Sequence, residues 1–378
     1  MMKKTIFAAG ALCVMLIAPL SALADAPLGL PPVPVPENNP ITKEKVELGS
    51  KLFNDKRFST TGEVSCATCH DAAKGFTDGP LSVSEGINGL TGTRNAPTVI
   101  NAAYMKTQFW DGREPDLEGQ SKGPFVNPVE MGLENHDPIL EIVRSDKEYG
   151  QMFKKAFGIS QKKITMEHVS KAIASFERTI IAGDSPFDRY VYGGDKTAMS
   201  EAAIRGLRVF RFEGRCESCH TTSETFALFS DSKFHNLNVN FDKISGSLHS
   251  VTETFKSNKE GGLDLDVTVL TDAEASELGR FVVSTQPADI GAFKTPTLRN
   301  IELTAPYMHD GSIKTLEEVV DFYNNGGRVD PDGPVNDFQS SGIRPLNLTD
   351  QQKADLVEFL KALTSSKKTL QNLAEMMK

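Results

Sequence analysis

Four cysteines and two histidines of this chain fall in two short sequences with identical spacing. These read Cys66-Ala67-Thr68-Cys69-His70 and Cys216-Glu217-Ser218-Cys219-His220. A C-x-x-C-H motif attaches a c-type haem: the two thiols add to the porphyrin vinyl groups, and the histidine binds the iron. A zinc site is the main alternative, but the chain offers no further cysteine pair or H-x-x-x-H element to complete one. We therefore expect two covalent haems, with His70 and His220 as iron ligands.

The first 24 residues have the pattern of a secretory signal peptide. Lys3 and Lys4 precede an apolar stretch from Ile6 to Leu20, and Ala22-Leu23-Ala24 resembles a cleavage site. The apolar stretch is too short to cross a membrane comfortably. We expect residues 1–24 to be removed and the mature protein to be exported to the periplasm, without a stable membrane span.

Composition excludes several other classes of protein. The chain has 378 residues, which predicts about two domains. Hydrophobic residues make up 39% and charged residues 24%, so neither a multi-span membrane protein nor a disordered acidic chain is expected. The net charge of −9 argues against a nucleic-acid partner, because such proteins present basic surfaces.

The elements that must position the two motifs are predicted to be helices. Apolar residues recur at helical spacing before each motif, within 43–54 and again from Ile204 to Phe210. Further helical patterns cover 138–157 and 166–181, and two capping boxes, Thr315 with Glu318 and Thr349 with Gln352, each open a helix. Residues 221–297 look irregular, with some short strands. We predict a mainly α fold with long ligand-bearing loops.

The domain organisation follows from the two motifs. Residues 25–42 are rich in proline and are expected to form an extended arm on the surface or a disordered one. Residues 43–188 and 189–378 are then expected to form two cytochrome-c-like haem domains, one around each motif.

The chain resembles the bacterial di-haem cytochrome c peroxidase family, which includes the MauG enzymes of methylamine utilisation. The resemblance covers both halves of the mature chain in family order. It rests on LGSKLFNDKRFSTTGEVSCATCHD (48–71), TRNAPTVIN (93–101), QFWDGREPDLEGQ (108–120), NPVEM (127–131), CESCH (216–220), FKTPTLRNIELTAPYMHDGS (293–312) and LVEFLKALT (356–364).

The resemblance implies roles for particular residues. The N-terminal haem would react with hydrogen peroxide, with Glu130 as the distal acid and Gln120 as the distal glutamine. A carboxyl beside the iron can move a proton to the leaving oxygen during O–O cleavage. Trp110 would relay electrons between the haems, although a packing role is the alternative. One calcium ion would bind at Asn95, Thr304 and Pro306, since oxygen ligands suit this cation.

Two departures from the family pattern bear on mechanism. Many relatives place a distal histidine on the loop LSVSEGINGLTGTRNAPT (81–98), but here Ile87 or Asn88 stands at about that position. The N-terminal iron is therefore expected to be open before any reduction. Typical peroxidases of the family supply a methionine to the C-terminal haem at the position of Tyr323. MauG-type enzymes carry a tyrosine there, as this chain does. A phenolate favours oxidised iron. The alternative is that Tyr323 only packs and that Met308 or another group binds the iron.

These features predict a periplasmic peroxidase-family oxidoreductase that reduces hydrogen peroxide. Its electrons would pass through the C-terminal haem from one of two donors, a small cytochrome c or cupredoxin, or an aromatic residue of a protein substrate as in MauG. The alternative from another class is a di-haem electron-transfer cytochrome without peroxide chemistry, which would need six ligands on both irons.

Overall fold

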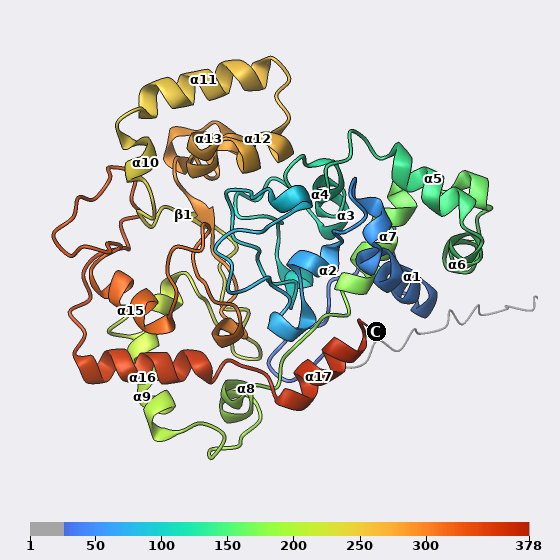
Figure 1. Cartoon of the computed structure of the whole chain (residues 1–378). Helices are drawn as coiled ribbons and strands as arrows, with labels where there is room; N and C mark the ends of the chain where they lie inside the picture. The colour runs from blue at the N-terminus through green and yellow to red at the C-terminus, as the bar shows by residue number, and fades with distance from the viewer. Residues whose placement is uncertain (1–25, 378) are drawn as a thin grey trace, which may run out of the picture.

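The computed structural model describes residues 26–377 and shows a mostly helical protein (Figure 1). The expected signal peptide, residues 1–24, lies outside the described residues. The α-helices are α1 (Lys43–Asn54), α2 (Cys66–Cys69), α3 (Leu117–Gln120), α4 (Gly123–Val126), α5 (Asp137–Ser145), α6 (Lys147–Phe157), α7 (Met166–Glu177), α8 (Pro186–Val191), α9 (Glu201–Arg211), α10 (Asp242–Ser245), α11 (Leu248–Glu260), α12 (Leu265–Thr271), α13 (Ala273–Glu277), α14 (Phe281–Ser284), α15 (Leu316–Asn324), α16 (Asp350–Lys361) and α17 (Lys367–Glu375).

Strands contribute little to the fold. β1 (Phe234–His235) pairs antiparallel with β2 (Phe293–Lys294). Short 3-10 helices occupy Lys56–Phe58, Ala72–Lys74, Ile87–Gly89, Ala102–Tyr104, Gln161–Lys163, Cys216–Ser218, Pro287–Asp289 and Ile301–Leu303. The mainly α fold predicted from the sequence is confirmed. No helix within residues 26–377 is both long and apolar enough to cross a membrane.

A close helix pair supports each haem motif. In the N-terminal half α1 packs against α7, and a side chain at Gly49 would begin 2.0 Å from the Ala172 carbonyl oxygen. In the C-terminal half α9 packs against α16, and a side chain at Gly206 would begin 1.9 Å from the Asp355 carbonyl oxygen. Only glycine permits backbones to approach this closely. Each helix that precedes a haem motif is therefore held by a close helix–helix contact at a glycine.

The helical pattern over 138–157 forms two helices rather than one. α5 ends at Ser145, and Asp146 has an extended backbone with φ −75° and ψ 119°. Its carboxylate accepts hydrogen bonds from the backbone nitrogens of Glu148, at 2.9 Å, and Tyr149, at 3.3 Å. Asp146 thus caps α6 and breaks the run, because a capping side chain satisfies donors that a continuous helix would bond internally.

The expectation of an irregular region over 221–297 is wrong for a large part of it. Residues 242–284, called the helical lobe below, contain α10 to α14. Asp264 and Asp272 cap α12 and α13 by accepting backbone hydrogen bonds. The lobe has an apolar core that includes Ile244, Leu278 and Phe281. Four of its five helices have seven residues or fewer, so their periodicity is weak in the sequence and the packing of this small core stabilises them.

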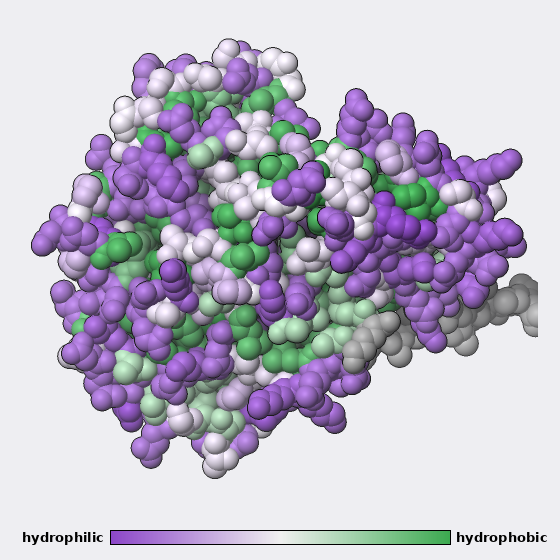
Figure 2. Space-filling view, in the orientation of Figure 1, coloured by the Kyte–Doolittle hydropathy of each residue, from purple (hydrophilic) through white to green (hydrophobic). Residues whose placement is uncertain are grey.

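The two ends of the described chain fasten the halves together. The proline-rich arm is ordered: Leu30 is buried, and the Tyr104 hydroxyl donates to the Pro31 carbonyl at 2.9 Å. At the other end, Leu373 of α17 belongs to the core of the N-terminal half, although α17 follows the C-terminal haem domain in sequence. Figure 2 shows a largely hydrophilic face, with hydrophobic residues gathered toward the middle of the molecule.

A buried ion pair anchors the arm and gives a stability prediction. Arg299 donates to both Asp188 oxygens at 2.8 Å and to the Gly29 carbonyl, and both side chains are at most 1% exposed. We expect Asp188→Ala to lower the free energy of unfolding by about 3–5 kcal/mol, because it leaves a buried, unpaired guanidinium. Asp184→Ala is the control, since its pair with Arg189 is exposed and is worth about 0–1 kcal/mol. Chemical denaturation measures both; equal losses would contradict the prediction.

Candidate haem sites and the distal carboxyl

Both motif histidines have the local geometry of an iron ligand. His70 Nδ1 lies 3.2 Å from the Phe76 carbonyl oxygen, and His220 Nδ1 lies 2.8 Å from the Phe229 carbonyl oxygen. Each carbonyl accepts the Nδ1 proton and orients the ring. Metal-binding histidines commonly use this arrangement, which leaves Nε2 for the metal. The carbonyls come from the loops just after each motif, so the two sites are built in the same way.

The C-terminal motif faces a cavity of about 590 Å³. Its walls include Cys216, Cys219 and His220, together with Tyr323 of α15. Cofactor pockets typically enclose roughly 300–1,000 Å³. The donor set is one imidazole, two thiols at the attachment spacing and one phenol, so the residues present fit a covalently attached haem.

Tyr323 projects into this cavity from α15. Burial, together with the nearby Cys216 and Cys219 thiols, raises the pKa of the Tyr323 phenol above its ordinary value. A buried phenol of this kind becomes an anion only when a cation such as ferric iron binds its oxygen. Met308 and His235 line the same cavity. His235 Nε2 is engaged by Asp231 at 2.9 Å, whereas Met308 remains a second candidate ligand.

The N-terminal motif lies beside a carboxyl group. Burial and then the neighbouring acids Asp78 and Glu130 raise the pKa of the Cys69 thiol to about 12. Burial also raises the pKa of Glu130 itself to about 7; Arg113 opposes this effect and Asp266 adds to it. A carboxyl with a pKa near neutrality can both accept and release a proton at the working pH. Glu130 therefore combines proximity to the haem motif with the acidity that proton transfer requires.

Of the two residues expected at about the position of the relatives' distal histidine, Ile87 is buried and Asn88 is exposed. Ile87 is 7% exposed, and its backbone nitrogen donates to the Glu130 carbonyl at 2.9 Å. A side chain at Gly86 would begin 2.1 Å from the Val129 carbonyl oxygen, so this loop is pressed against the segment that carries Glu130. Neither Ile87 nor Gly86 can bind iron.

The histidines outside the motifs are mostly engaged elsewhere. His136 bonds the Lys122 carbonyl, His168 the Thr165 hydroxyl, and His309 the Glu277 carboxylate, at 2.7–3.0 Å. His249 is exposed on α11. These contacts give His136, His168 and His309 partners within the protein.

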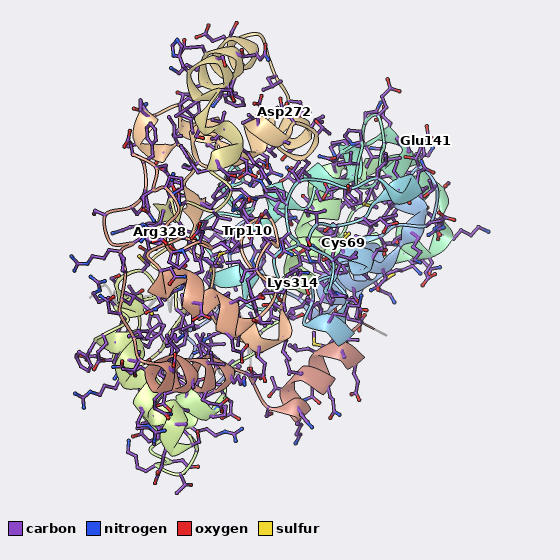
Figure 3. All side chains as sticks on the ribbon, turned by 60° about the vertical axis from the view of Figure 1, so that its left-hand side comes forward. Cys69, Trp110, Glu141, Asp272, Lys314 and Arg328 are labelled. Carbon is purple, nitrogen blue, oxygen red and sulfur yellow. The ribbon has the colours of Figure 1, made fainter. Side chains whose placement is uncertain are left out.

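Trp110 lies between the two halves. Its indole nitrogen donates to the Asn95 carbonyl at 2.9 Å, and its own carbonyl accepts from the backbone nitrogen of Lys294 at 2.8 Å. Trp110 also lines the C-terminal cavity. Figure 3 shows it near the middle of the molecule. This placement suits the expected relay, while the indole hydrogen bond also gives Trp110 a structural role.

The three residues expected at a calcium ion border the same cavity. Asn95, Thr304 and Pro306 all line the C-terminal cavity. Asn95 Nδ2 donates to the Ser82 carbonyl at 3.1 Å, which aims the amide but leaves its oxygen as an acceptor. An amide oxygen and backbone carbonyls are ligands that calcium prefers.

Gln120, the expected distal glutamine, is the last residue of α3 and is partly buried.

Three charged residues near the N-terminal site were missed by sequence reasoning. Arg113 and Asp266 both act on Glu130. Glu177 of α7 is 5% exposed, its Oε2 has no hydrogen-bond partner, and burial raises its pKa to about 8. Arg113 lies within residues 108–120, a segment that resembles the family, so the motif could have indicated it. Glu177 and Asp266 sit in ordinary helical sequence that gives no such signal.

Comparisons with known proteins identify the family of this chain. Residues 43–197 match the family model of the di-haem cytochrome c peroxidases. The chain is 36% identical to Cytochrome-c peroxidase IdrP1 of Denitromonas iodatirespirans, over 96% of this chain and 93% of that protein. It is 35% identical to Methylamine utilization protein MauG of Methylorubrum extorquens, over 88% of this chain and 81% of that protein. The chain belongs to the di-haem cytochrome c peroxidase family.

A solved structure supports the same assignment. A MauG-like protein associated with microbial copper homeostasis has a TM-score of 0.75 and 34% identity, covering 92% of this chain and 96% of that one. This di-haem peroxidase-family enzyme therefore carries two c-type haems, as its two C-x-x-C-H motifs require. Its relatives include both cytochrome c peroxidases and MauG proteins, so membership alone does not assign an electron donor.

Proposed function

We propose that this enzyme reduces hydrogen peroxide at the N-terminal haem, held by Cys66, Cys69 and His70. The observation that carries the proposal is Glu130, a carboxyl with a pKa of about 7 beside the haem motif, next to Ile87 instead of a histidine. The haem supplies the iron and the electrons when it is bound. Reduction of one peroxide consumes two electrons and two protons and yields two water molecules.

The protein residues handle the protons of this reaction. The Glu130 carboxylate accepts a proton from peroxide at its Oε atoms, and the protonated acid then donates it to the departing oxygen. This transfer avoids a charged leaving group, which is the usual gain from general acid–base catalysis. Gln120, at the end of α3, would orient the peroxide by hydrogen bonding. Ile87 would keep the site dry and free of a competing ligand.

The C-terminal haem, with His220 and Tyr323 as ligands, would hold oxidising equivalents and pass them through Trp110. Phenolate ligation favours the oxidised iron. This favours an aromatic residue of a protein substrate as the source of electrons, as in MauG. A small periplasmic cytochrome c or cupredoxin is the other donor that the family supports. Export to the periplasm and one calcium ion at Asn95, Thr304 and Pro306 complete the proposal.

One experiment tests peroxide reduction and separates the donors. One equivalent of hydrogen peroxide is added to the diferric enzyme, and the absorption spectrum is followed with and without reduced cytochrome c. We expect a rapid spectral change without prior reduction. Slow decay with little cytochrome oxidation would favour a protein aromatic donor, and rapid cytochrome oxidation would favour a small carrier. If the spectrum does not respond and the ferric haems are entirely low-spin, the molecule is an electron-transfer cytochrome instead.

A further inference from the structure

One residue of the helical lobe, Asp266, contacts the segments that carry Arg113 and Glu130. Asp266, at the start of α12, accepts a hydrogen bond from Arg113 Nε at 2.5 Å. Its backbone carbonyl accepts from Asn127 Nδ2 at 2.6 Å, and Asn127 lies three residues before Glu130. A side chain at Gly123 would begin 3.2 Å from the Asp266 carboxylate. Figure 1 shows α12 facing the segment of α3 and α4. Asp266 is thus packed onto the Glu130 segment from another part of the chain.

Arg113 is the group through which Asp266 acts. Its side chain is only 5% exposed and is stacked on the Phe109 ring, 3.5 Å from the centroid. Its Nη1 donates to both oxygens of Asp111, at 3.0 and 3.2 Å. Burial by itself would lower the pKa of Arg113, but Asp111 and Asp266 raise it above its ordinary value. The guanidinium is therefore a fixed cation held between two carboxylates, close enough to influence Glu130.

Charges of both signs act on Glu130. Arg113 stabilises its carboxylate, and Asp266 destabilises it. The Cys66 and Cys69 thiols on α2 also lie nearby, but they become uncharged thioethers once haem is attached. Glu114 faces Arg113 and Asp266 rather than Glu130. Without Asp266, Arg113 would lose one of its two carboxylate partners and would be drawn toward Glu130, since a buried guanidinium seeks a paired anion.

We propose that Asp266 is a positioning residue for the peroxide reaction: it reaches from the helical lobe, holds the Arg113 guanidinium, and so sets how readily Glu130 exchanges a proton. This inference rests on the proposed role of Glu130. The helical lobe, which belongs to the C-terminal half, would then assist the reaction at the N-terminal haem.

The test is Asp266→Asn in the haem-loaded enzyme. Asparagine keeps the size of the side chain and the backbone contact with Asn127. The apparent pKa of the second-order reaction with peroxide is measured, and so is that of the infrared band of protonated Glu130, identified by its loss in Glu130→Gln. Both are expected to fall by about 0.5–1 pH unit, since removing Asp266 takes away a negative charge and frees Arg113 for Glu130. Asp266→Glu is expected to restore most of the wild-type value.

Asp242→Asn is the matched control, because it removes the same charge from an exposed position of the same lobe. Its pH profile should superimpose on that of the wild type. Unchanged pKa values in a folded, haem-loaded Asp266→Asn enzyme would overturn the inference. If that variant does not fold, Asp266→Ser carries the same expectation. Wild-type reactivity of Glu130→Gln would refute the proposed role of Glu130, on which this inference rests, whereas an impaired Glu130→Gln with an unaffected Asp266→Asn refutes only the role of Asp266.

Discussion

Glu130→Gln is expected to slow the reaction of the diferric enzyme with hydrogen peroxide by about 10²–10⁴-fold. The amide preserves the shape and the backbone contact with Ile87, but it cannot accept a proton from peroxide and return it to the departing oxygen. Stopped-flow absorbance at several peroxide concentrations gives the second-order rate constant. The haem content, measured as the pyridine haemochrome, should stay at two per chain.

Glu134→Gln supplies the control, because Glu134 is exposed four residues further along the same segment. It should react at the wild-type rate. Similar rates for wild type and Glu130→Gln would remove Glu130 from the mechanism and leave peroxide cleavage to another group.

The wild-type rate is also expected to depend on pH with a defined sign. Burial raises the pKa of Glu130 to about 7, and the carboxylate is the form that accepts the first proton. The rate constant should therefore increase as the pH rises through about 7 and level off above it. In Glu130→Gln this rising limb should disappear. A rate that falls over the same range would indicate that the protonated acid is the form that reacts.

Tyr323→Phe is expected to raise the reduction potential of the C-terminal haem by on the order of 100 mV or more, because axial ligands set haem potentials over a wide range. Loss of the phenolate oxygen removes the ligand that stabilises ferric iron, and Met308 in the same cavity is then free to bind. Spectroelectrochemical titration gives the two potentials separately, and electron paramagnetic resonance reports the change of ligand. The N-terminal haem should keep its potential.

Tyr307→Phe is the matched control for this substitution. Tyr307 lines the same cavity, but its hydroxyl already donates to the Ile301 carbonyl at 3.2 Å. The same chemical change there should leave the potential of the C-terminal haem nearly unaltered. If Tyr323→Phe changes neither the spectrum nor the potential, Tyr323 packs against the haem and Met308 or another group is the ligand.

Features set by neighbouring residues were readable from the sequence. Each C-x-x-C-H motif implies a haem because the attachment chemistry acts within five residues. The capping boxes at Thr315 and Thr349 are present in the structure, since a cap needs only a side chain and the backbone three residues on. The family and the mainly α fold followed from motifs spread over both halves. Asp146 was overlooked as a helix break because a single aspartate does not disturb apolar periodicity.

Features that join distant segments were decided by the tertiary structure alone. The helical lobe forms because α10 to α14 bury a shared core. Single helices as short as these are at best marginally stable in water by themselves. The acidity of Glu130 depends on its removal from water and on Asp266, which lies 136 residues further along the chain. The sequence could name Glu130 as an acid beside a haem, because residue type and motif sufficed. Its capacity to exchange a proton near neutral pH arises only when folding brings Arg113, Asp266 and Glu130 together, since electrostatic interactions depend on distance in space.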